Sequence, residues 1–144
     1  MQINHITPDY AVSPQVAPTD FAQIAQAGFK TVICNRPDGE NPADLHICEM
    51  KAAAKAQGLV FLENPFPSPA MTMDHVTAQA DLLDNAQTPV FAYCASGTRC
   101  SVVWSMVMAG KMSTDEILQA VRGAGYMLDG LRPQIDALAR TRDA

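Results

Sequence analysis

The stretch PVFAYCASGTRCSVVWSMVMA, residues 89–109, decides how this chain folds. Its first five residues, Pro89–Tyr93, form a short apolar run that is typical of a buried strand. Its last eight, Val102–Ala109, are apolar on nearly every side, which predicts a central, buried helix. The loop Cys94–Ser101 joins the two. We therefore expect a strand, a short loop and a helix in the interior of an α/β protein.

Short strands and helices alternate on both sides of this segment. Runs of β-branched and apolar residues predict further strands at His5–Thr7, Tyr10–Ser13, Phe29–Cys34 and Leu59–Leu62. Helices are predicted from Pro18 to Gly28, from Asn41 to Gly58, from Thr72 to Ala86, from Ser113 onward and from Leu131 to Arg140. Helices between strands act as crossover connections, so we predict a mainly parallel central sheet with helices on both faces.

Ligands of such sheets bind beyond the carboxyl ends of the strands. Two loops with unusual chemistry lie at such strand ends, Asn35–Glu40 and Cys94–Arg99. The sequence therefore places the candidate site between these two loops.

Polar residues at the predicted helix starts are the expected N-caps. They are Thr19, Asn41, Thr72 and Ser113, the last within a Ser-Thr-Asp-Glu capping box. The helix that follows Asn41 has an apolar face made of Leu45, Cys48, Ala52 and Ala56. We therefore expect Cys48 to lie in the core.

Composition limits the class of protein. The 144 residues suit one domain, residues 1–144. With 48% hydrophobic residues, the chain is not wholly disordered. A net charge of −5 argues against binding to nucleic acid or to a membrane surface, because such proteins carry a basic stripe. No apolar run approaches the roughly 20 residues of a membrane span.

The start of the chain and its cysteines suggest a compartment. The opening residues, MQINHITPDY, show no basic segment followed by an apolar core, so no signal peptide is expected. The four cysteines contain no C-x-x-C pair, and we expect reduced thiols in a cytoplasm. The three histidines lack metal-ligand spacing, so we expect no metal.

The loop Cys94–Arg99 combines a nucleophile with the means to bind an oxyanion. The backbone N–H groups expected to form an anion-binding nest belong to Ala95, Ser96, Gly97, Thr98 and Arg99. The following helix adds the positive end of its dipole, and Arg99 offers a planar fork for two oxygens. The same positive field lowers the pKa of Cys94 and favours a thiolate nucleophile. The alternative is a glycine-containing turn with an inert buried cysteine and a surface arginine.

Four stretches of the chain carry a family resemblance: YAVSPQ (residues 10–15), AGFKTVI (27–33), RPDGE (36–40) and YCASGTR (93–99). The last resembles the active-site loop of cysteine-dependent phosphatases of the protein-tyrosine-phosphatase superfamily, and also that of rhodanese sulfurtransferases. Together the four are similar to the bacterial phosphatase-like domain that also occurs fused to beta-lactamase-like hydrolases.

This resemblance implies a phosphatase-like α/β fold and a phosphatase that uses no metal or other cofactor. Cys94 would attack phosphorus and carry a phosphocysteine intermediate, which water then hydrolyses. Arg99 and the loop amides would hold the equatorial oxygens of a phosphorylated partner, either a small molecule or a protein.

Three departures from the phosphatase pattern leave other functions open. Four residues separate Cys94 from Arg99, whereas these phosphatases typically have five and rhodaneses have the shorter loop. Tyr93 stands where phosphatases commonly have His, and Cys100 where they usually have Ser or Thr. The alternatives are a rhodanese-like sulfurtransferase, which takes persulfide sulfur from a donor onto Cys94, and a non-catalytic oxyanion-binding or redox module.

A phosphatase usually needs a general acid to protonate its leaving group. Asp38, on a strand-end loop, fits this role best by position. The other candidates are Glu40, Glu63 and Asp74. The alternative for Asp38 is an ordinary residue of a Pro-Asp-Gly turn.

Three further side chains near the predicted mouth have two interpretations each. Arg36 either binds a substrate anion or is a solvated loop charge. Cys34 and Cys100 either form a disulfide with Cys94, which would protect it from overoxidation, or are small buried apolar side chains.

Overall fold

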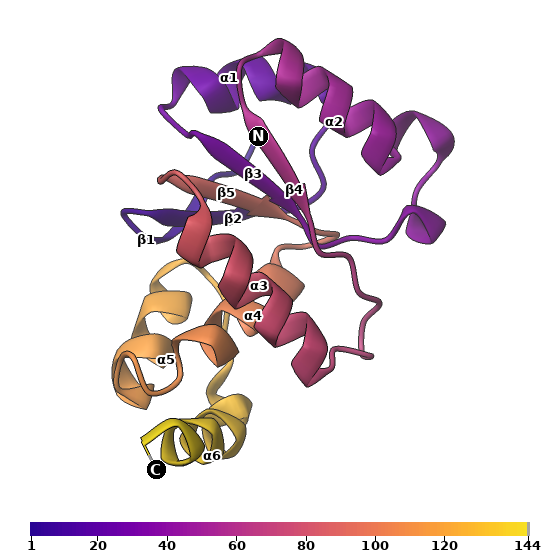
Figure 1. The fold of residues 1–144 in the computed structure, drawn as a ribbon. Coiled ribbons are helices and arrows are strands. Elements are labelled where there is room, and N and C mark those ends of the chain that lie inside the picture. The colour runs from indigo at the N-terminus through magenta and orange to yellow at the C-terminus, as the bar shows by residue number, and fades with distance from the viewer. Residues whose placement is uncertain (144) are drawn as a thin grey trace.

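A computed structural model describes residues 1–143 and has a five-stranded sheet at its centre (Figure 1). The strands are β1 (Asn4–Thr7), β2 (Tyr10–Ser13), β3 (Thr31–Cys34), β4 (Val60–Glu63) and β5 (Val90–Tyr93). They lie in the order β1-β2-β5-β3-β4, and only the β1–β2 pair is antiparallel. The mainly parallel sheet predicted from the sequence is confirmed.

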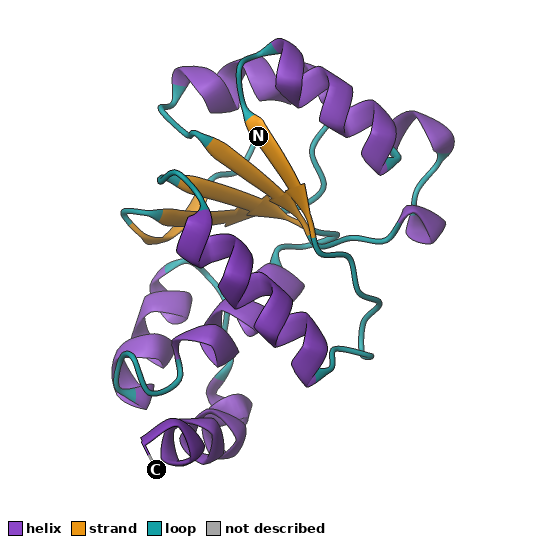
Figure 2. Ribbon diagram, in the orientation of Figure 1, coloured by secondary structure: helices purple, strands orange, loops and turns teal. Residues whose placement is uncertain are grey.

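Helices cover both faces of this sheet (Figure 2). They are α1 (Phe21–Gln26), α2 (Ile47–Ala56), α3 (Met73–Asn85), α4 (Thr98–Met108), α5 (Thr114–Gly123) and α6 (Arg132–Asp143). The first two lie on one face and the other four on the opposite face, so the buried apolar residues form two clusters. The helix-covered α/β architecture is thus confirmed. Within residues 1–143, none of these helices has both the length and the apolar character that crossing a membrane requires.

Strand β5 is the middle strand, and all four of its residues are buried. It pairs with β2 on one side and β3 on the other, so that Tyr93 lies opposite Ser13 and Cys34. The carboxyl ends of the three strands therefore meet at one edge of the sheet. This places Cys94, immediately after β5, between the loops that follow β2 and β3.

Helix α4 is nearly enclosed, as the apolar pattern predicted. Val103 and Trp104 are 0% and 3% exposed, and the Trp104 ring stacks on Tyr10 of β2 at 6.1 Å. The helix begins at Thr98, inside the loop predicted from sequence. The helix N-terminus thus lies next to Cys94, because the loop from the strand is only four residues long.

Two predicted N-caps are wrong. Pro18–Asp20 form a 3-10 turn in which Asp20 accepts a hydrogen bond from the Ala17 N–H at 2.8 Å, so Thr19 caps no helix. Asn41 precedes another 3-10 turn, and α2 begins only at Ile47. In both places a short 3-10 turn precedes the helix and delays its start.

The start of α2 also changes which side chains it buries. Met50 and Ala54, four residues apart, form its buried stripe. Cys48 is exposed, so its predicted place in the core is wrong.

Two other caps are confirmed. Thr72 precedes α3, and its N–H donates to His75 Nδ1 at 3.0 Å. Ser113 and Glu116 exchange two hydrogen bonds of 3.1 Å at the start of α5, which is the predicted capping box.

Candidate active site

The loop after β5 turns sharply at Gly97, which leads into α4. Gly97 has φ +93°, a left-handed conformation that favours glycine. A Cβ atom built there would lie 2.0 Å from the hydroxyl oxygen of Tyr126. That hydroxyl donates to the Ser96 carbonyl at 3.0 Å and accepts from Asn4 Nδ2 at 3.0 Å. Tyr126 therefore holds the loop by a hydrogen bond and leaves room only for glycine at position 97. Sequence reasoning did not single out this tyrosine.

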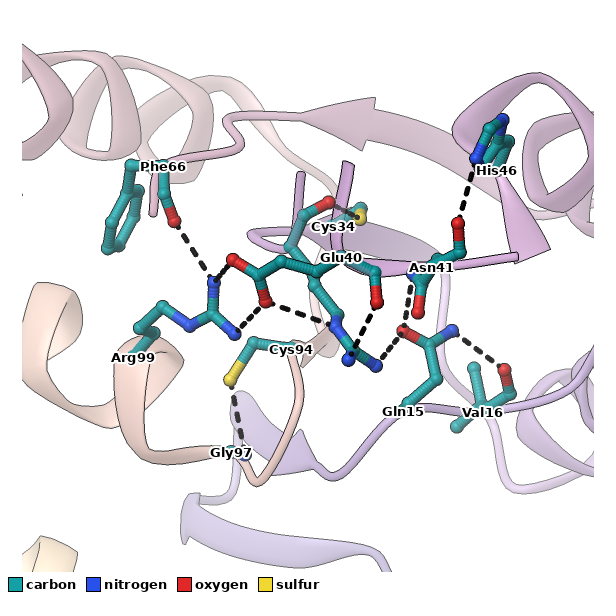
Figure 3. Close-up of polar contacts among 11 residues, drawn as sticks. Gln15, Val16, Cys34, Glu40, Asn41, His46, Phe66, Cys94, Gly97 and Arg99 are labelled. Atoms are coloured by element: carbon teal, nitrogen blue, oxygen red, sulfur yellow. Dashed lines mark hydrogen bonds and ion pairs between the residues drawn. The ribbon is translucent and has the colours of Figure 1, made fainter. Parts of the chain in front are cut away.

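The backbone of this loop stabilises the sulfur of Cys94 as a thiolate. The Gly97 N–H donates to Cys94 Sγ at 3.1 Å (Figure 3), and the backbone amides of Ser96 and Cys100 also favour the ionised form of the sulfur. Hydrogen bonding by the Cys100 side chain, aided by these amides, lowers the pKa of Cys94 to about 5 against the opposing effect of burial. A cysteine with this pKa is largely a thiolate at neutral pH.

Cys100 stands one residue after Arg99, within the first turn of α4. It is fully buried, and burial raises the pKa of its thiol well above its usual value. The Cys100 thiol therefore stays protonated and can donate to the Cys94 thiolate. The hydroxyl of Ser101 donates instead to the Gly97 carbonyl at 2.8 Å. A thiol thus takes the place in which the resemblance implied a hydroxyl.

Arg99 is held by the loop after β3. Its Nη1 donates to Glu40 Oε2 at 2.9 Å and to the Phe66 carbonyl at 3.1 Å, and Nη2 donates to Glu40 Oε1 at 2.7 Å (Figure 3). Hydrogen bonding to Arg99 lowers the pKa of the Glu40 carboxyl, so the pair stays ionised. Three of the five N–H donors are thus used. The N–H of Nε and the second N–H of Nη2 lie along one edge of the guanidinium. Neither has a partner within residues 1–143, so both are available to two oxygens of an oxyanion.

Arg36 also forms a hydrogen-bonded ion pair with the carboxylate of Glu40. Its Nε donates to Glu40 Oε1 at 3.3 Å, its Nη2 to the Glu40 carbonyl at 3.2 Å and its Nη1 to Gln15 Oε1 at 3.3 Å. Arg36 therefore lies at the predicted mouth, with its guanidinium committed to Glu40 and Gln15. The RPDGE stretch acts as one unit that presents a carboxylate to Arg99.

The acid candidates lie in different surroundings. Asp38 Oδ1 accepts the Ile47 N–H at 2.7 Å, at the first residue of α2. Its other oxygen has no hydrogen bond within residues 1–143. Glu63 ends β4 and Asp74 lies in the first turn of α3, and both are exposed. The structure brings Glu40 alone among the four to Arg99.

A cavity of about 550 Å³ opens beside the loop. The residues that line it are Phe66, Pro67, Ser68, Pro69 and Met71 before α3, Ala95, Ser96, Thr98, Arg99, Val102 and Met106 in the segment from β5 into α4, and Leu131 and Gln134 around the start of α6. Arg99 is the sole charged residue among them. The proline-rich loop that follows β4, residues 64–70, therefore lines part of the candidate site.

A buried network of amide side chains holds the start of this proline-rich loop in place. Gln79 of α3 accepts at Oε1 from Asn35 Nδ2 and Asn64 Nδ2, both at 2.9 Å. Asn35 also donates to the Asn64 carbonyl, and Asn64 to the His75 carbonyl, both at 2.9 Å. The ends of β3 and β4 are thus tied to α3. Sequence reasoning missed this network, although a glutamine on an otherwise apolar helix face is a visible signal.

The remaining cysteine and aromatic residue of the predicted site are core residues. Cys34 Sγ donates to the Arg36 carbonyl at 3.3 Å, and burial raises the pKa of its thiol. Tyr93 is 1% exposed and packs against Phe61 at 6.4 Å. All four cysteines are free thiols in this structure. Within residues 1–143, no three His, Cys, Asp or Glu side chains are grouped so as to hold a metal ion.

Comparison with known proteins identifies a family and relatives that this chain resembles. The family model described as "Beta-lactamase hydrolase-like protein, phosphatase-like domain" matches residues 2–111. A beta-lactamase hydrolase-like protein of Agrobacterium fabrum is 31% identical over 120 residues, which are 82% of this chain and 27% of that protein. One from Xylella fastidiosa is 29% identical over 130 residues, 89% of this chain and 30% of that protein. The chain therefore spans less than a third of the length of these relatives.

Solved structures show the same fold. A candidate phosphatase from Neisseria meningitidis has 34% identity and a TM-score of 0.84, and the match covers 96% of this chain and 99% of that one. The catalytic core of the PP-IP phosphatase SIW14 from S. cerevisiae has 17% identity and a TM-score of 0.69, over 98% and 90% of the two chains. The fold is that of protein-tyrosine-phosphatase-like proteins, and the chain belongs to the family of phosphatase-like domains of beta-lactamase hydrolase-like proteins.

Proposed function

We propose that this chain is a cysteine-dependent phosphatase that hydrolyses phosphate monoesters without a metal ion. The observation that carries the proposal is the thiolate of Cys94 beside the unpaired edge of Arg99. The family and the fold support a phosphatase-type activity. The low pKa of Cys94 supports its role as nucleophile.

In the first step, Cys94 Sγ attacks phosphorus and the bond to the leaving oxygen breaks. The Nε and Nη2 edge of Arg99 and the loop amides of residues 95–99 bind the equatorial oxygens, where charge builds up. The leaving oxygen takes a proton, for which Asp38 remains the proposed donor. Because Asp38 Oδ1 is held by α2, substrates with good leaving groups are favoured.

In the second step, water attacks the phosphocysteine and the S–P bond breaks. Inorganic phosphate leaves, and Cys94 returns as a thiolate. The protonated thiol of Cys100 stabilises that thiolate by donating a hydrogen bond. A reducing compartment such as the cytoplasm keeps both thiols in the form that this step needs.

A second candidate function is sulfur transfer. It is favoured by the four-residue spacing from Cys94 to Arg99 and by a cavity without carboxylates. Cys94 would attack the outer sulfur of thiosulfate, sulfite would leave, and Cys94 would keep the sulfur as a persulfide. No proton donor is needed, because sulfite leaves as a stable anion.

Hydrolysis of an aryl phosphate by the wild type and by Cys94→Ser separates these functions. Phosphate release that the variant lacks supports the phosphatase. No release, together with a one-sulfur mass gain on Cys94 after thiosulfate, supports the sulfurtransferase instead. If neither occurs and phosphate still raises the melting temperature, the chain is a binding module.

A further inference from the structure

A second apolar hollow adjoins the cavity beside the candidate active site. This hollow has a volume of about 300 Å³ and shares Met71, Met106 and Gln134 with the first. Its other lining residues are Thr72, Met73, Val76, Ala137 and Leu138. The shared wall consists mainly of methionine, which is unbranched and adapts to different ligand shapes.

The charge in these two hollows is confined to one end. Arg99, at the loop, is the sole charged residue that lines either of them. No lysine, histidine, aspartate or glutamate lies in their walls. A ligand with one anionic group can therefore place it at Arg99, while the rest of the molecule meets apolar side chains.

A peptide fits these walls poorly. Its backbone brings N–H and C=O groups that need partners when they leave water. Pro67 and Pro69 have no N–H to offer, and the polar side chains away from the loop are those of Ser68, Thr72 and Gln134. A polyanion also fits poorly, because its additional charges would find no cation.

We propose that the substrate is a small aryl phosphate with a single phosphate group and an apolar extension on its ring. This inference rests on the proposed phosphatase function, which supplies the identity of the anionic group. The phosphate lies at Arg99, the ring lies between Pro67 and Val102, and the extension runs past Met106 toward Leu138.

Equilibrium binding of non-hydrolysable phosphonates to wild type and to Cys94→Ser tests this substrate class. We expect phenylphosphonate to bind about 10- to 100-fold more tightly than methylphosphonate, as for burial of an aromatic side chain. Each methylene of a 4-alkyl group should add up to about fourfold until the hollows are full. Inositol hexakisphosphate should gain little over inorganic phosphate.

Two variants show where the gain arises. Met106→Asp and Leu131→Asp should remove most of the gain from the ring and the alkyl group, and Met127→Asp should leave it unchanged. Met127 is 68% exposed and lines neither hollow, so it is the matched control. If Met106→Asp fails to fold, Leu131→Asp at the half-buried rim gives the answer alone.

The outcomes separate this inference from the proposed function. Equal binding of methyl- and phenylphosphonate, or tighter binding of the polyanion, overturns the substrate class even if aryl phosphates are hydrolysed. Tighter binding of the apolar phosphonates without any hydrolysis overturns the phosphatase and keeps the ligand class.

Discussion

The guanidinium of Arg99 meets the carboxylate of Glu40 through two parallel hydrogen bonds of 2.9 Å and 2.7 Å. The two residues lie 59 positions apart: Glu40 is on the segment that follows β3, and Arg99 is in the first turn of α4, which follows the neighbouring strand β5. The Arg99 side chain is 11% exposed and that of Glu40 33%. Glu40 therefore orients the arginine, and the Nε–Nη2 edge of the guanidinium has no partner within residues 1–143.

Replacing Glu40 tests this orienting role. Glu40→Gln removes one charged acceptor, and we expect about a tenfold loss of kcat/KM on an aryl phosphate, equivalent to about 1.4 kcal/mol. Phosphate should also raise the melting temperature of the variant less than that of wild type. Glu49→Gln on α2, which makes no side-chain ion pair within residues 1–143, is the control. Tighter phosphate binding by Glu40→Gln would instead mean that Glu40 competes with the ligand.

The close approach of Tyr126 to Gly97 predicts a non-additive pair of substitutions. Gly97→Ala should cost about 1–2 kcal/mol for the left-handed backbone alone, plus the clash with the tyrosine hydroxyl. Tyr126→Phe removes that oxygen, so the double variant should be more stable than the sum of the two single changes predicts. Thermal or urea unfolding of all four proteins measures the coupling. Simple additivity would show that the loop moves away from Tyr126 without resistance.

Much of this fold could be predicted because its strands are short apolar runs bounded by turn residues. The run that ends at Tyr93 and the buried helix after it show the strand–loop–helix unit, and Thr72 and Ser113 mark two helix starts correctly. Thr19 and Asn41 failed because 3-10 turns intervene before the helices, which local propensity does not reveal.

The candidate site, too, could be predicted only in part from the sequence. Cys94 and Arg99 could be found from their spacing and the glycine between them. Glu40 as the partner of Arg99 could not, because the contact depends on which strands are neighbours in the sheet. The role of Tyr126 was likewise hidden, because it depends on how the segment after α5 packs under the loop.

The thiol of Cys100 predicts a pH effect at Cys94. Since hydrogen bonding by Cys100 is the largest cause of the low pKa of Cys94, Cys100→Ala should raise that pKa and Cys100→Ser should largely restore it. In wild type the thiolate is lost as pH falls through about 5. In the alanine variant this loss should occur at higher pH.

Alkylation of Cys94 by iodoacetamide across a pH series, followed by mass spectrometry, measures this midpoint. The exposed Cys48 serves as an internal reference for the reagent in each sample. An unchanged midpoint in Cys100→Ala would assign the low pKa to the loop amides alone.

The amide network predicts a stability effect with a local signature. Gln79→Leu leaves the Asn35 and Asn64 side chains short of an acceptor, which should cost about 1–3 kcal/mol in urea unfolding. The proline-rich loop should also become more sensitive to proteolysis, because Asn64 anchors its start. Gln119→Leu, an exposed position on α5, is the matched control. Loss of stability without new cleavage in the loop would show that the network stabilises the core but does not anchor the loop.

Asp38 has one observed contact and one proposed catalytic role, and the dependence of rate on the leaving group can separate the two. As a helix cap, it accepts the Ile47 N–H, and Asp38→Asn retains an oxygen for that bond. As a general acid, it would protonate the leaving oxygen, which asparagine cannot do. We therefore expect Asp38→Asn to remain folded, to hydrolyse 4-nitrophenyl phosphate at nearly the wild-type rate, and to lose about 100-fold on phenyl phosphate, because general acid catalysis contributes typically 10²–10⁴-fold. Equal rates for the variant and wild type on both esters would leave Asp38 with the cap alone, because the acid matters most where the leaving group is poor.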